Sequence, residues 1–374
     1  PGLPEVLAAI ENSSKPIVAA IHGTALGGGF EVSLACHYRC AIASAKVGLP
    51  EVKLGLLPGA GGTQRVPRLI GVKAALNMIT RGDPIAAVKA NEMGLLDKVL
   101  DCDDVRAGAL SYAKELVDTG ASLKRVRDIT IDPSSVEIGF FENARKQLAK
   151  RARGQIAQDR IVSCLEAAVE LPIDKGLERE RELFKELITS PESAAMRHIF
   201  FAERQAAKIK DSPKDTALRP IKQVAILGGG TMGGGIAMCF ANIGIPVLLL
   251  EINDEALERG MGIIQKNYAI TVQKGKLTED QMKKRIGLIS GTTSYDEVSE
   301  VDLVIEAVFE NLDLKKDVFG KLDATCKQGA ILATNTSYQD VNAIAEATSR
   351  PGDVVGMHFF SPANVMKLLE VVRG

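Results

Sequence analysis

The sequence has 374 residues with a formal net charge of -1, 25% charged residues, 4% aromatic residues and no tryptophan. A nearly neutral chain with few aromatic side chains lacks the basic surface and stacking platforms of nucleic-acid binders, so we expect no nucleic-acid partner. No apolar run reaches the length of a membrane span, and we expect no integral membrane segment. A chain of this length is expected to form two or three domains.

The six cysteines are scattered along the chain, and only Cys36 and Cys40 lie close together. Because no second cysteine pair accompanies them and the chain has only four histidines, we expect no metal site. Unpaired cysteine usage fits a reducing compartment. The sequence begins at Pro1 in what reads as the interior of a domain and ends at Gly374 just after a predicted strand, so we expect a piece of a longer protein, with any terminal targeting signal outside it.

The first half opens with a predicted helix over residues 3–12 and a buried strand over residues 15–22. Three glycines, Gly27 to Gly29, then precede a second helical pattern that ends near Cys36. Glycines before a helix expose backbone N–H groups to an anionic or polarised atom. Glu31 lies in the first turn of this helix, where a carboxylate is favoured by the helix dipole even without a catalytic role.

A second carboxylate, Glu51, lies twenty positions later in an apolar loop that ends in another glycine-rich turn around Gly61. Two glutamates in apolar, glycine-rich surroundings indicate paired acid–base work. A glycosidase pair is the competing interpretation, but such sites use aromatic platforms for sugars, which this sequence lacks.

The segments His22–Glu31 (HGTALGGGFE) and Gly48–Arg65 (GLPE…LPGAGGTQR) resemble signatures of the crotonase superfamily of enoyl-CoA hydratases and isomerases. The resemblance covers about the first hundred residues and implies a ββα spiral fold acting on acyl-CoA thioesters. It implies that Glu31 and Glu51 hold and activate the water that adds to an enoyl-CoA. It also implies that the Gly28 N–H is one donor of an oxyanion hole, whose other donor lies upstream of Pro1.

Helical patterns follow over residues 105–117, 135–153 and 159–171, and two more lie within residues 176–210. Ser190 and Pro191 form an N-cap and first-turn pair, and residues 211–216 indicate a boundary. We therefore divide the chain into a hydratase/isomerase domain at 1–175, a helical linker at 176–219 and a second domain at 220–374. The linker resembles that of multifunctional fatty-acid oxidation enzymes, in which it packs back on the hydratase domain.

The second domain begins with a β-forming run, residues 224–227, that ends in the glycine cluster Gly228, Gly230 and Gly233 ahead of a helix. This G-x-G-x-x-G spacing favours a tight turn, close approach to a pyrophosphate and close packing of helix on strand. Glu251 ends the next predicted strand, where a Rossmann fold places the acid that binds the ribose 2′-hydroxyl. Because this carboxylate repels a 2′-phosphate, the sequence predicts NAD as the cofactor rather than NADP. A merely flexible turn is the alternative interpretation of the glycines.

Further strands and helices alternate after Glu251. We predict a helix over residues 254–274, a capping box at Thr278 and Gln281, a strand over residues 301–310 and a strand over residues 330–334. This alternation is typical of a doubly wound parallel sheet. The fold class expected for the chain is therefore α/β, with a ββα spiral followed by a Rossmann domain.

Near the C-terminus, His358 and Glu370 lie on two predicted strands joined by a Ser-Pro turn. A lone histidine among apolar residues is more often a satisfied core group. Here an antiparallel pairing would bring the imidazole to a carboxylate, which makes it a general base for a hydroxyl proton.

The motifs GGGTMG, VIEAVFE, NTS and HFFSPANVMKLLEV together resemble the 3-hydroxyacyl-CoA dehydrogenase family over residues 220–374. The resemblance implies His358 as the base, Glu370 as its orienting partner and Ser337 as a contact to the substrate oxygen. It also implies that the NAD contacts include Met232, Glu310, Lys315 and Asn335. The helical domain that completes such sites lies beyond Gly374 in the family.

A hydratase followed by a dehydrogenase resembles the multifunctional enzymes of fatty-acid β-oxidation. The expected activity is hydration of trans-2-enoyl-CoA, with isomerisation of 3-enoyl-CoA, followed by NAD-dependent oxidation of 3-hydroxyacyl-CoA. The expected location is the peroxisome, with the corresponding mitochondrial and bacterial complexes as alternatives. The competing hypothesis is a non-catalytic chain that only binds NAD or CoA or has a role in assembly.

Overall fold

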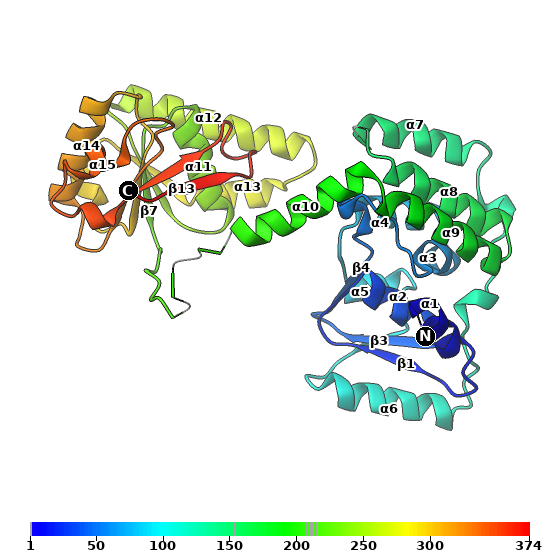
Figure 1. Ribbon diagram of the computed structural model, residues 1–374. Helices are drawn as coiled ribbons and strands as arrows, with labels where there is room; N and C mark the ends of the chain where they lie inside the picture. Colours follow the sequence, from blue (N-terminus) through cyan, green and yellow to red (C-terminus); the bar gives the residue numbers. More distant parts are fainter. Residues whose placement is uncertain (1, 153, 207, 210–211, 214) are drawn as a thin grey trace. The chain divides into compact units, whose positions relative to one another are not determined.

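The computed structural model describes residues 2–152, 154–206, 208–209, 212–213 and 215–374. It divides into two compact units, Pro1–Ser212 and Pro213–Gly374, each with its own buried core (Figure 1). Among the described residues, no helix combines the length and the apolar character needed to cross a membrane.

The first unit begins with strand pairs that alternate with helices. These elements are α1 (Leu3–Glu11), β1 (Val18–Ile21), β2 (Thr24–Leu26), α2 (Gly28–Ala35), β3 (Tyr38–Ile42), β4 (Lys46–Gly48), η1 (Glu51–Leu54), α3 (Gly62–Ile70), α4 (Val72–Arg81), β5 (Ile85–Ala86), α5 (Ala87–Glu92) and β6 (Lys98–Leu100). The strands form one sheet of order β1-β3-β6 and another of order β2-β4-β5. Successive strand pairs therefore contribute one strand to each sheet, which is the ββα spiral expected from the sequence.

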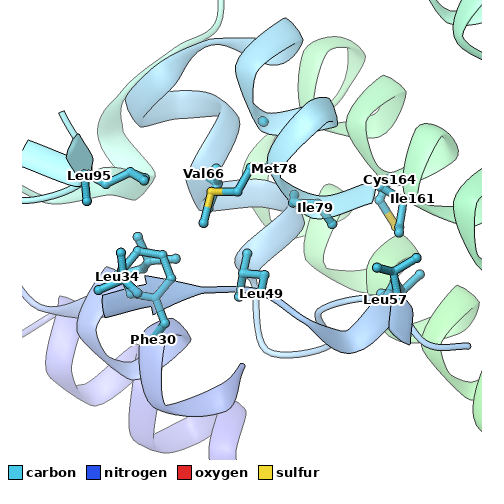
Figure 2. Packing of buried hydrophobic residues seen from close by; sticks show 14 of the residues in the cluster. Phe30, Leu34, Leu49, Leu57, Val66, Met78, Ile79, Leu95, Ile161 and Cys164 are labelled. Atoms are coloured by element: carbon cyan, nitrogen blue, oxygen red, sulfur yellow. The ribbon is translucent and has the colours of Figure 1, made fainter. Parts of the chain in front are cut away.

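Helices complete the first unit. They are α6 (Val105–Asp118), η2 (Val126–Asp128), η3 (Pro133–Ser135), α7 (Phe140–Ala152), α8 (Ala157–Glu170), α9 (Ile173–Ile188) and α10 (Pro191–Ala206). Helix α6 covers the outer face of the β1-β3-β6 sheet, where Tyr112 and Leu116 pack with Tyr38 (Figure 1). The main core lies between the second sheet and helices α2, α3, α4 and α8, and Figure 2 shows Phe30, Val66 and Ile161 converging there.

One predicted helix begins later than expected. The sequence pattern predicted a helix from Ser135, but α7 starts at Phe140, after Gly139 with a φ of 78°. Asp132 instead caps the short 3₁₀ turn η3 by accepting a hydrogen bond from the Ser134 N–H, so the local cap stops the helix from extending backwards. The last residue of that prediction, Arg153, lies outside the described residues, as do Asp211 and Lys214 of the predicted boundary.

Helices α9 and α10 belong to the first compact unit. Helix α9 packs on α3 and α8, and α10 contacts η1. The predicted N-cap is present, because the hydroxyl of Ser190 accepts a hydrogen bond from the Ser193 N–H at 3.1 Å. The division into a hydratase domain and a helical linker at 176–219 stays our proposal.

The second unit alternates strands and helices. Its elements are β7 (Val224–Leu227), α11 (Thr231–Asn242), β8 (Val247–Leu250), α12 (Asp254–Gln273), α13 (Glu279–Ile286), β9 (Ile289–Thr292), η4 (Tyr295–Val298), β10 (Leu303–Glu306), α14 (Leu312–Thr325), β11 (Ile331–Thr334), α15 (Val341–Ala345), η5 (Pro351–Asp353), β12 (Val354–Phe359) and β13 (Leu369–Val372). The sheet has the order β13-β12-β11-β10-β7-β8-β9, with an antiparallel pair only at β12 and β13 among its described pairings. This is the doubly wound order of a Rossmann fold, as predicted.

Both faces of this sheet are covered, which explains why its central strands are continuously apolar. Val224 and Ile226 of β7 pack against α11 and α12, while Ala225 and Leu227 pack against α14 and α15. The capping box at Thr278 and Gln281 is present at the start of α13, as expected. Strand β10 ends at Glu306, so Glu310 lies in the loop before α14 rather than on the predicted strand.

Candidate active sites

The first site is organised by the N-terminal turn of α2. Gly27 adopts a φ of 56° and a ψ of -131°, a conformation that glycine tolerates, and α2 starts at Gly28. As the first residue of the helix, Gly28 has an N–H without an intrahelical acceptor. Glu31 lies in the same first turn and is only 3% exposed, so this turn carries both a free N–H and a buried carboxylate.

The loop before α3 binds the Glu31 carboxylate. Oε1 of Glu31 accepts hydrogen bonds from the Ala60 N–H at 2.7 Å and the Gly62 N–H at 2.8 Å. Burial raises the pKa of Glu31, while these two hydrogen bonds and the positive charge of Arg65 oppose that shift. The donors favour the ionised form, which suits Glu31 to act as a base.

Glu51 has a different environment at the start of η1. Its Oε2 is buried and has no hydrogen-bond partner among the described residues. Burial, followed by the charge of Glu31, raises the pKa of Glu51 to about 8. Gly27 leaves room for this carboxyl group, since a Cβ at Gly27 would lie 2.8 Å from Oε1 of Glu51. Burial thus raises the pKa of both carboxyl groups, but Glu31 accepts two backbone hydrogen bonds whereas Oε2 of Glu51 has no partner among the described residues, a difference of environment typical of an acid–base pair.

The second site begins at the glycine-rich turn between β7 and α11. Gly228 has a φ of 94°, and a Cβ at Gly233 would lie 1.7 Å from the carbonyl oxygen of Gly228. A Cβ at Gly230 would meet no atom within 4 Å, so the backbone there is open to a ligand. Glu251 follows β8 and accepts hydrogen bonds from the Gly229 N–H at 2.6 Å and the Ile252 N–H at 3.1 Å. The open backbone beside a carboxylate fits a dinucleotide.

The carboxyl ends of the central strands meet at one edge of the sheet. Glu306 of β10 lies in register with Leu227 of β7 and with Thr334 of β11. A cavity of about 360 Å³ opens at this edge and is lined in part by Met232, Glu310, Lys315, Asn335, Ser337 and His358. The structure therefore brings six of the predicted site residues around one space.

His358 and Glu370 face each other across β12 and β13. They are direct partners in the antiparallel register, and the imidazole Nδ1 lies 2.8 Å from Oε2 of Glu370. The predicted meeting of these side chains is confirmed. The opposite ring nitrogen, Nε2, remains for another partner, as a general base requires.

Comparison with known proteins finds a family match in each of the two units. Residues 2–137 match the family model described as enoyl-CoA hydratase/isomerase, and residues 223–374 match that of the NAD binding domain of 3-hydroxyacyl-CoA dehydrogenase. The chain joins a hydratase/isomerase domain to an NAD-binding dehydrogenase domain. The match to the second family identifies NAD as the cofactor of the dehydrogenase domain.

The chain is also similar to curated relatives along nearly its whole length. The chain is 43% identical to the peroxisomal bifunctional enzyme of Cavia porcellus, over 99% of this chain and 51% of the relative. It is 43% identical to the peroxisomal bifunctional enzyme of Homo sapiens, again over 99% of this chain and 51% of the relative. It is 40% identical to a peroxisomal fatty acid beta-oxidation multifunctional protein of Arabidopsis thaliana, over 97% of this chain and 51% of the relative. The chain thus spans about half the length of the curated relatives it matches.

In the dehydrogenase domain, Lys315 is more buried than a cofactor contact suggests. It is 1% exposed, and its ammonium lies 2.7 Å from Glu306 and 3.2 Å from Glu310. Glu306 also accepts a hydrogen bond from the Thr334 hydroxyl at 2.7 Å. Lys315 therefore forms ion pairs with two carboxylates at the wall of the cavity, and its contact with NAD stays a proposal.

Glu310 is held by several donors at the mouth of the cavity. It accepts hydrogen bonds from the Thr336 hydroxyl and from the Ser337 N–H. Burial favours the neutral acid, but the Thr336 hydrogen bond and the Lys315 charge prevail and lower the pKa of Glu310. Asn335 has a structural partner as well, since its side-chain oxygen accepts a hydrogen bond from the Phe359 N–H at 2.9 Å.

Sequence reasoning assigned no role to three acids that the structure buries, Glu11, Glu180 and Glu306. Glu306 was visible at the end of a strand but was given no role, and Glu180 of α9 was placed in the linker. Glu180 is 1% exposed, and in the sequence it falls on the helix face that carries Ile173, Leu183 and Leu187. A carboxylate within an apolar stripe is a signal of a buried charge with specific partners.

Proposed function

We propose that the chain catalyses two consecutive steps of fatty-acid β-oxidation. The hydratase/isomerase domain adds water to trans-2-enoyl-CoA, and the dehydrogenase domain oxidises the resulting 3-hydroxyacyl-CoA to 3-ketoacyl-CoA. The observation that supports this most directly is one acid–base pair in each family-matched domain: Glu31 with Glu51, and His358 with Glu370. Both steps act on acyl-CoA thioesters, so the product of the first site is the substrate of the second.

In the hydration step, ionised Glu31 takes a proton from water while the water oxygen bonds to C3 of the enoyl group. The electrons of the double bond move towards the thioester, and the Gly28 N–H stabilises the negative charge on its oxygen. Neutral Glu51 then gives its proton to C2. Glu31 ends protonated and Glu51 ionised, and exchange with solvent restores both. The same pair can move a proton between C4 and C2, which supports isomerisation of 3-enoyl-CoA as a second reaction of the site.

In the oxidation step, bound NAD would supply the acceptor for the hydride that leaves C3 of the substrate. His358 takes the hydroxyl proton through the ring nitrogen that faces away from Glu370, and Glu370 stabilises the charged imidazolium. Ser337 binds the same substrate oxygen. Gly228 and Gly230 would let the backbone approach the pyrophosphate, while Gly233 allows α11 to pack closely on β7. Glu251 would accept a hydrogen bond from the ribose hydroxyl and would disfavour a 2′-phosphate. Met232, Glu310, Lys315 and Asn335, which line one cavity, would contact NAD.

A crosswise assay tests this assignment. With crotonyl-CoA and NAD, loss of the enoyl absorbance reports hydration and NADH formation reports oxidation. Glu31→Gln should stop both signals from crotonyl-CoA but leave oxidation of 3-hydroxybutyryl-CoA intact. His358→Ala should stop NADH formation from either substrate but leave hydration intact. Absence of both activities in the parent chain would favour the non-catalytic hypothesis.

We also propose that the protein acts in the peroxisome, supported by the peroxisomal names of its relatives from animals and plants. Imaging of the tagged protein in cells beside a peroxisomal marker tests this location. A mitochondrial pattern would contradict it.

A further inference from the structure

Glu180 of α9 is a buried carboxylate with no part in the hydration steps described above. It accepts hydrogen bonds from the Gly61 N–H at 2.6 Å and the Thr63 N–H at 3.1 Å. The Thr63 hydroxyl donates a third. A carboxylate this deep in the fold is retained only with such partners, so its position is closely determined.

The same loop holds Glu31 on its other side. The amides of residues 60 and 62 donate to Glu31, and those of residues 61 and 63 donate to Glu180. Four consecutive N–H groups thus alternate between two carboxylates. Gly61 has a φ of 97°, a backbone conformation that glycine adopts readily, and this allows successive N–H groups to point to opposite sides of the loop.

The alternation couples the two carboxylates mechanically. Without an acceptor at position 180, two buried N–H groups lose their partner, and the backbone must rotate to satisfy them. Because neighbouring peptides share dihedral angles, rotation at residues 61 and 63 turns the amides at 60 and 62 away from Glu31. Glu31 would then lose the two donors that orient its carboxylate.

We propose that Glu180 is a positioning residue of the hydratase site, which fixes the loop of residues 60–63 so that its amides orient Glu31. This rests on the function proposed for Glu31 and assigns to α9 a direct part in building the site. Misplacement of a reacting group by about 1 Å costs about 10²-fold in rate. We therefore expect Glu180→Gln to lower kcat for crotonyl-CoA hydration by about 10–100-fold, with KM changed by less than about twofold, because Glu180 acts through the loop of residues 60–63 and is assigned no contact with substrate.

Charge provides a second readout. Burial, followed by the charge of Glu31, raises the pKa of Glu180. Because the interaction between two charges is mutual, a negative charge on Glu180 also raises the pKa of Glu31. The other titratable groups in this electrostatic cluster are Arg65 of α3, Glu11 of α1, Glu51 of η1, Cys164 of α8 and Arg179 of α9. Glutamine keeps the size of the side chain and removes its charge. In Glu180→Gln the pKa of Glu31 should therefore fall, and the acid limb of the pH profile of kcat/KM should move to lower pH.

The experiment compares Glu180→Gln, Glu180→Ala and Glu182→Gln in the chain with both units present. Glu182 lies on α9 but is exposed and pairs with Arg179, so it serves as the control. Oxidation of 3-hydroxybutyryl-CoA by the same samples reports the integrity of the other unit. If Glu180→Ala does not fold, Glu180→Gln carries the test.

A ¹³C NMR titration of the Glu31 carboxyl, with Glu31→Gln for assignment, gives the shift without turnover. The proposal predicts a lower Glu31 pKa and a slower kcat in Glu180→Gln, and parental behaviour in Glu182→Gln. A parental kcat and an unchanged Glu31 titration in Glu180→Gln would overturn it. The proposal would also be overturned if the loss of kcat in Glu180→Gln only matched the fraction of unfolded protein and the titration of Glu31 were unchanged. If the parent chain does not hydrate crotonyl-CoA, the proposed function fails, and the titration still decides whether Glu180 controls Glu31.

Discussion

The imidazole of His358 lies 2.8 Å from the carboxylate of Glu370, although twelve positions separate them in sequence. The two residues are opposite partners of the antiparallel pair β12 and β13, so the sheet register sets their contact. His358 is largely buried while Glu370 is half exposed, with side-chain exposures of 21% and 52%. Glu370 occupies Nδ1 of the ring, and the opposite ring nitrogen is left for another partner.

Removal of the imidazole should affect chemistry more than cofactor binding. We expect His358→Ala to lower the rate of 3-hydroxybutyryl-CoA oxidation by about 10²–10⁴-fold with a nearly unchanged NADH affinity. Glu370→Gln should also be slower. The double variant should lose little more than His358→Ala alone, because the pair acts as one unit. Losses that multiply would show two independent contributions, and a near-parental rate in His358→Ala would remove it from the mechanism.

The pH dependence of hydration should reveal Glu51. Its pKa is raised to about 8 by burial and by the charge of Glu31. If Glu51 must be protonated to act, kcat/KM falls as the pH rises through about 8. An initial-rate profile with crotonyl-CoA measures this limb. A profile that stays flat well above that pH would show that Glu51 is not the acid.

The same raised pKa makes a prediction about stability. The pKa of Glu51 is near its ordinary value of 4.5 in the unfolded chain and is raised to about 8 in the folded chain. Folding therefore favours the protonated form, and its stabilising contribution is complete below the lower value and lost as the pH rises through the upper one. Glu51→Gln should stabilise the first unit relative to the parent by a few kcal/mol above the upper value, at about 1.4 kcal/mol for each unit of pKa shift, and by much less below the lower one. Urea unfolding across this pH range measures the difference, and a difference independent of pH would contradict the prediction.

Two glycines of the second unit should separate folding from cofactor binding. Gly233→Ala puts a Cβ 1.7 Å from the Gly228 carbonyl oxygen, so strand and helix must move apart, at a cost of about 1–3 kcal/mol or more. A Cβ at Gly230 would meet no atom within 4 Å, and the φ of Gly230 is -66°, which alanine adopts readily. Gly230→Ala should therefore change the free energy of unfolding by less than about 0.5 kcal/mol. The added methyl group should still weaken NADH binding by about tenfold, equivalent to about 1.4 kcal/mol. Fluorescence titration and thermal unfolding test both variants, and parental NADH affinity in Gly230→Ala would contradict the assigned approach of the pyrophosphate.

Glu251 should determine the choice of dinucleotide. We expect Glu251→Ala to weaken NADH binding, because the ribose acceptor and the brace on the Gly229 N–H are both lost. The affinity for NADPH should fall less or rise, since the repulsion of its 2′-phosphate disappears. The dissociation constants of NADH and NADPH should therefore become more similar. Glu255→Ala, an exposed acid in the first turn of α12, is the matched control. An unchanged ratio in Glu251→Ala would remove Glu251 from cofactor selection.

Local sequence patterns were sufficient for much of this protein. The turn at Gly228 requires a backbone conformation that glycine adopts readily. Gly233, near the start of α11, leaves no room for a side chain because the Gly228 carbonyl oxygen lies against it. Continuous apolar runs such as residues 224–227 predicted strands buried on both faces, and the Thr278 capping box marked a helix start. These features depend on neighbours within a few positions, so one stretch of sequence contains their whole physical cause.

Only the tertiary structure decided which distant groups share a site. Glu180 meets the loop of residues 60–63 because α9 packs against α3, and no local pattern contains that contact. Glu306 receives the hydrogen bond from the Thr334 hydroxyl because β10 and β11 are neighbours in the sheet. The pKa of Glu51 likewise depends on how much chain covers it and on the nearby charge of Glu31. Burial and electrostatic coupling are sums over residues far apart in sequence, and the fold determines which residues enter each sum.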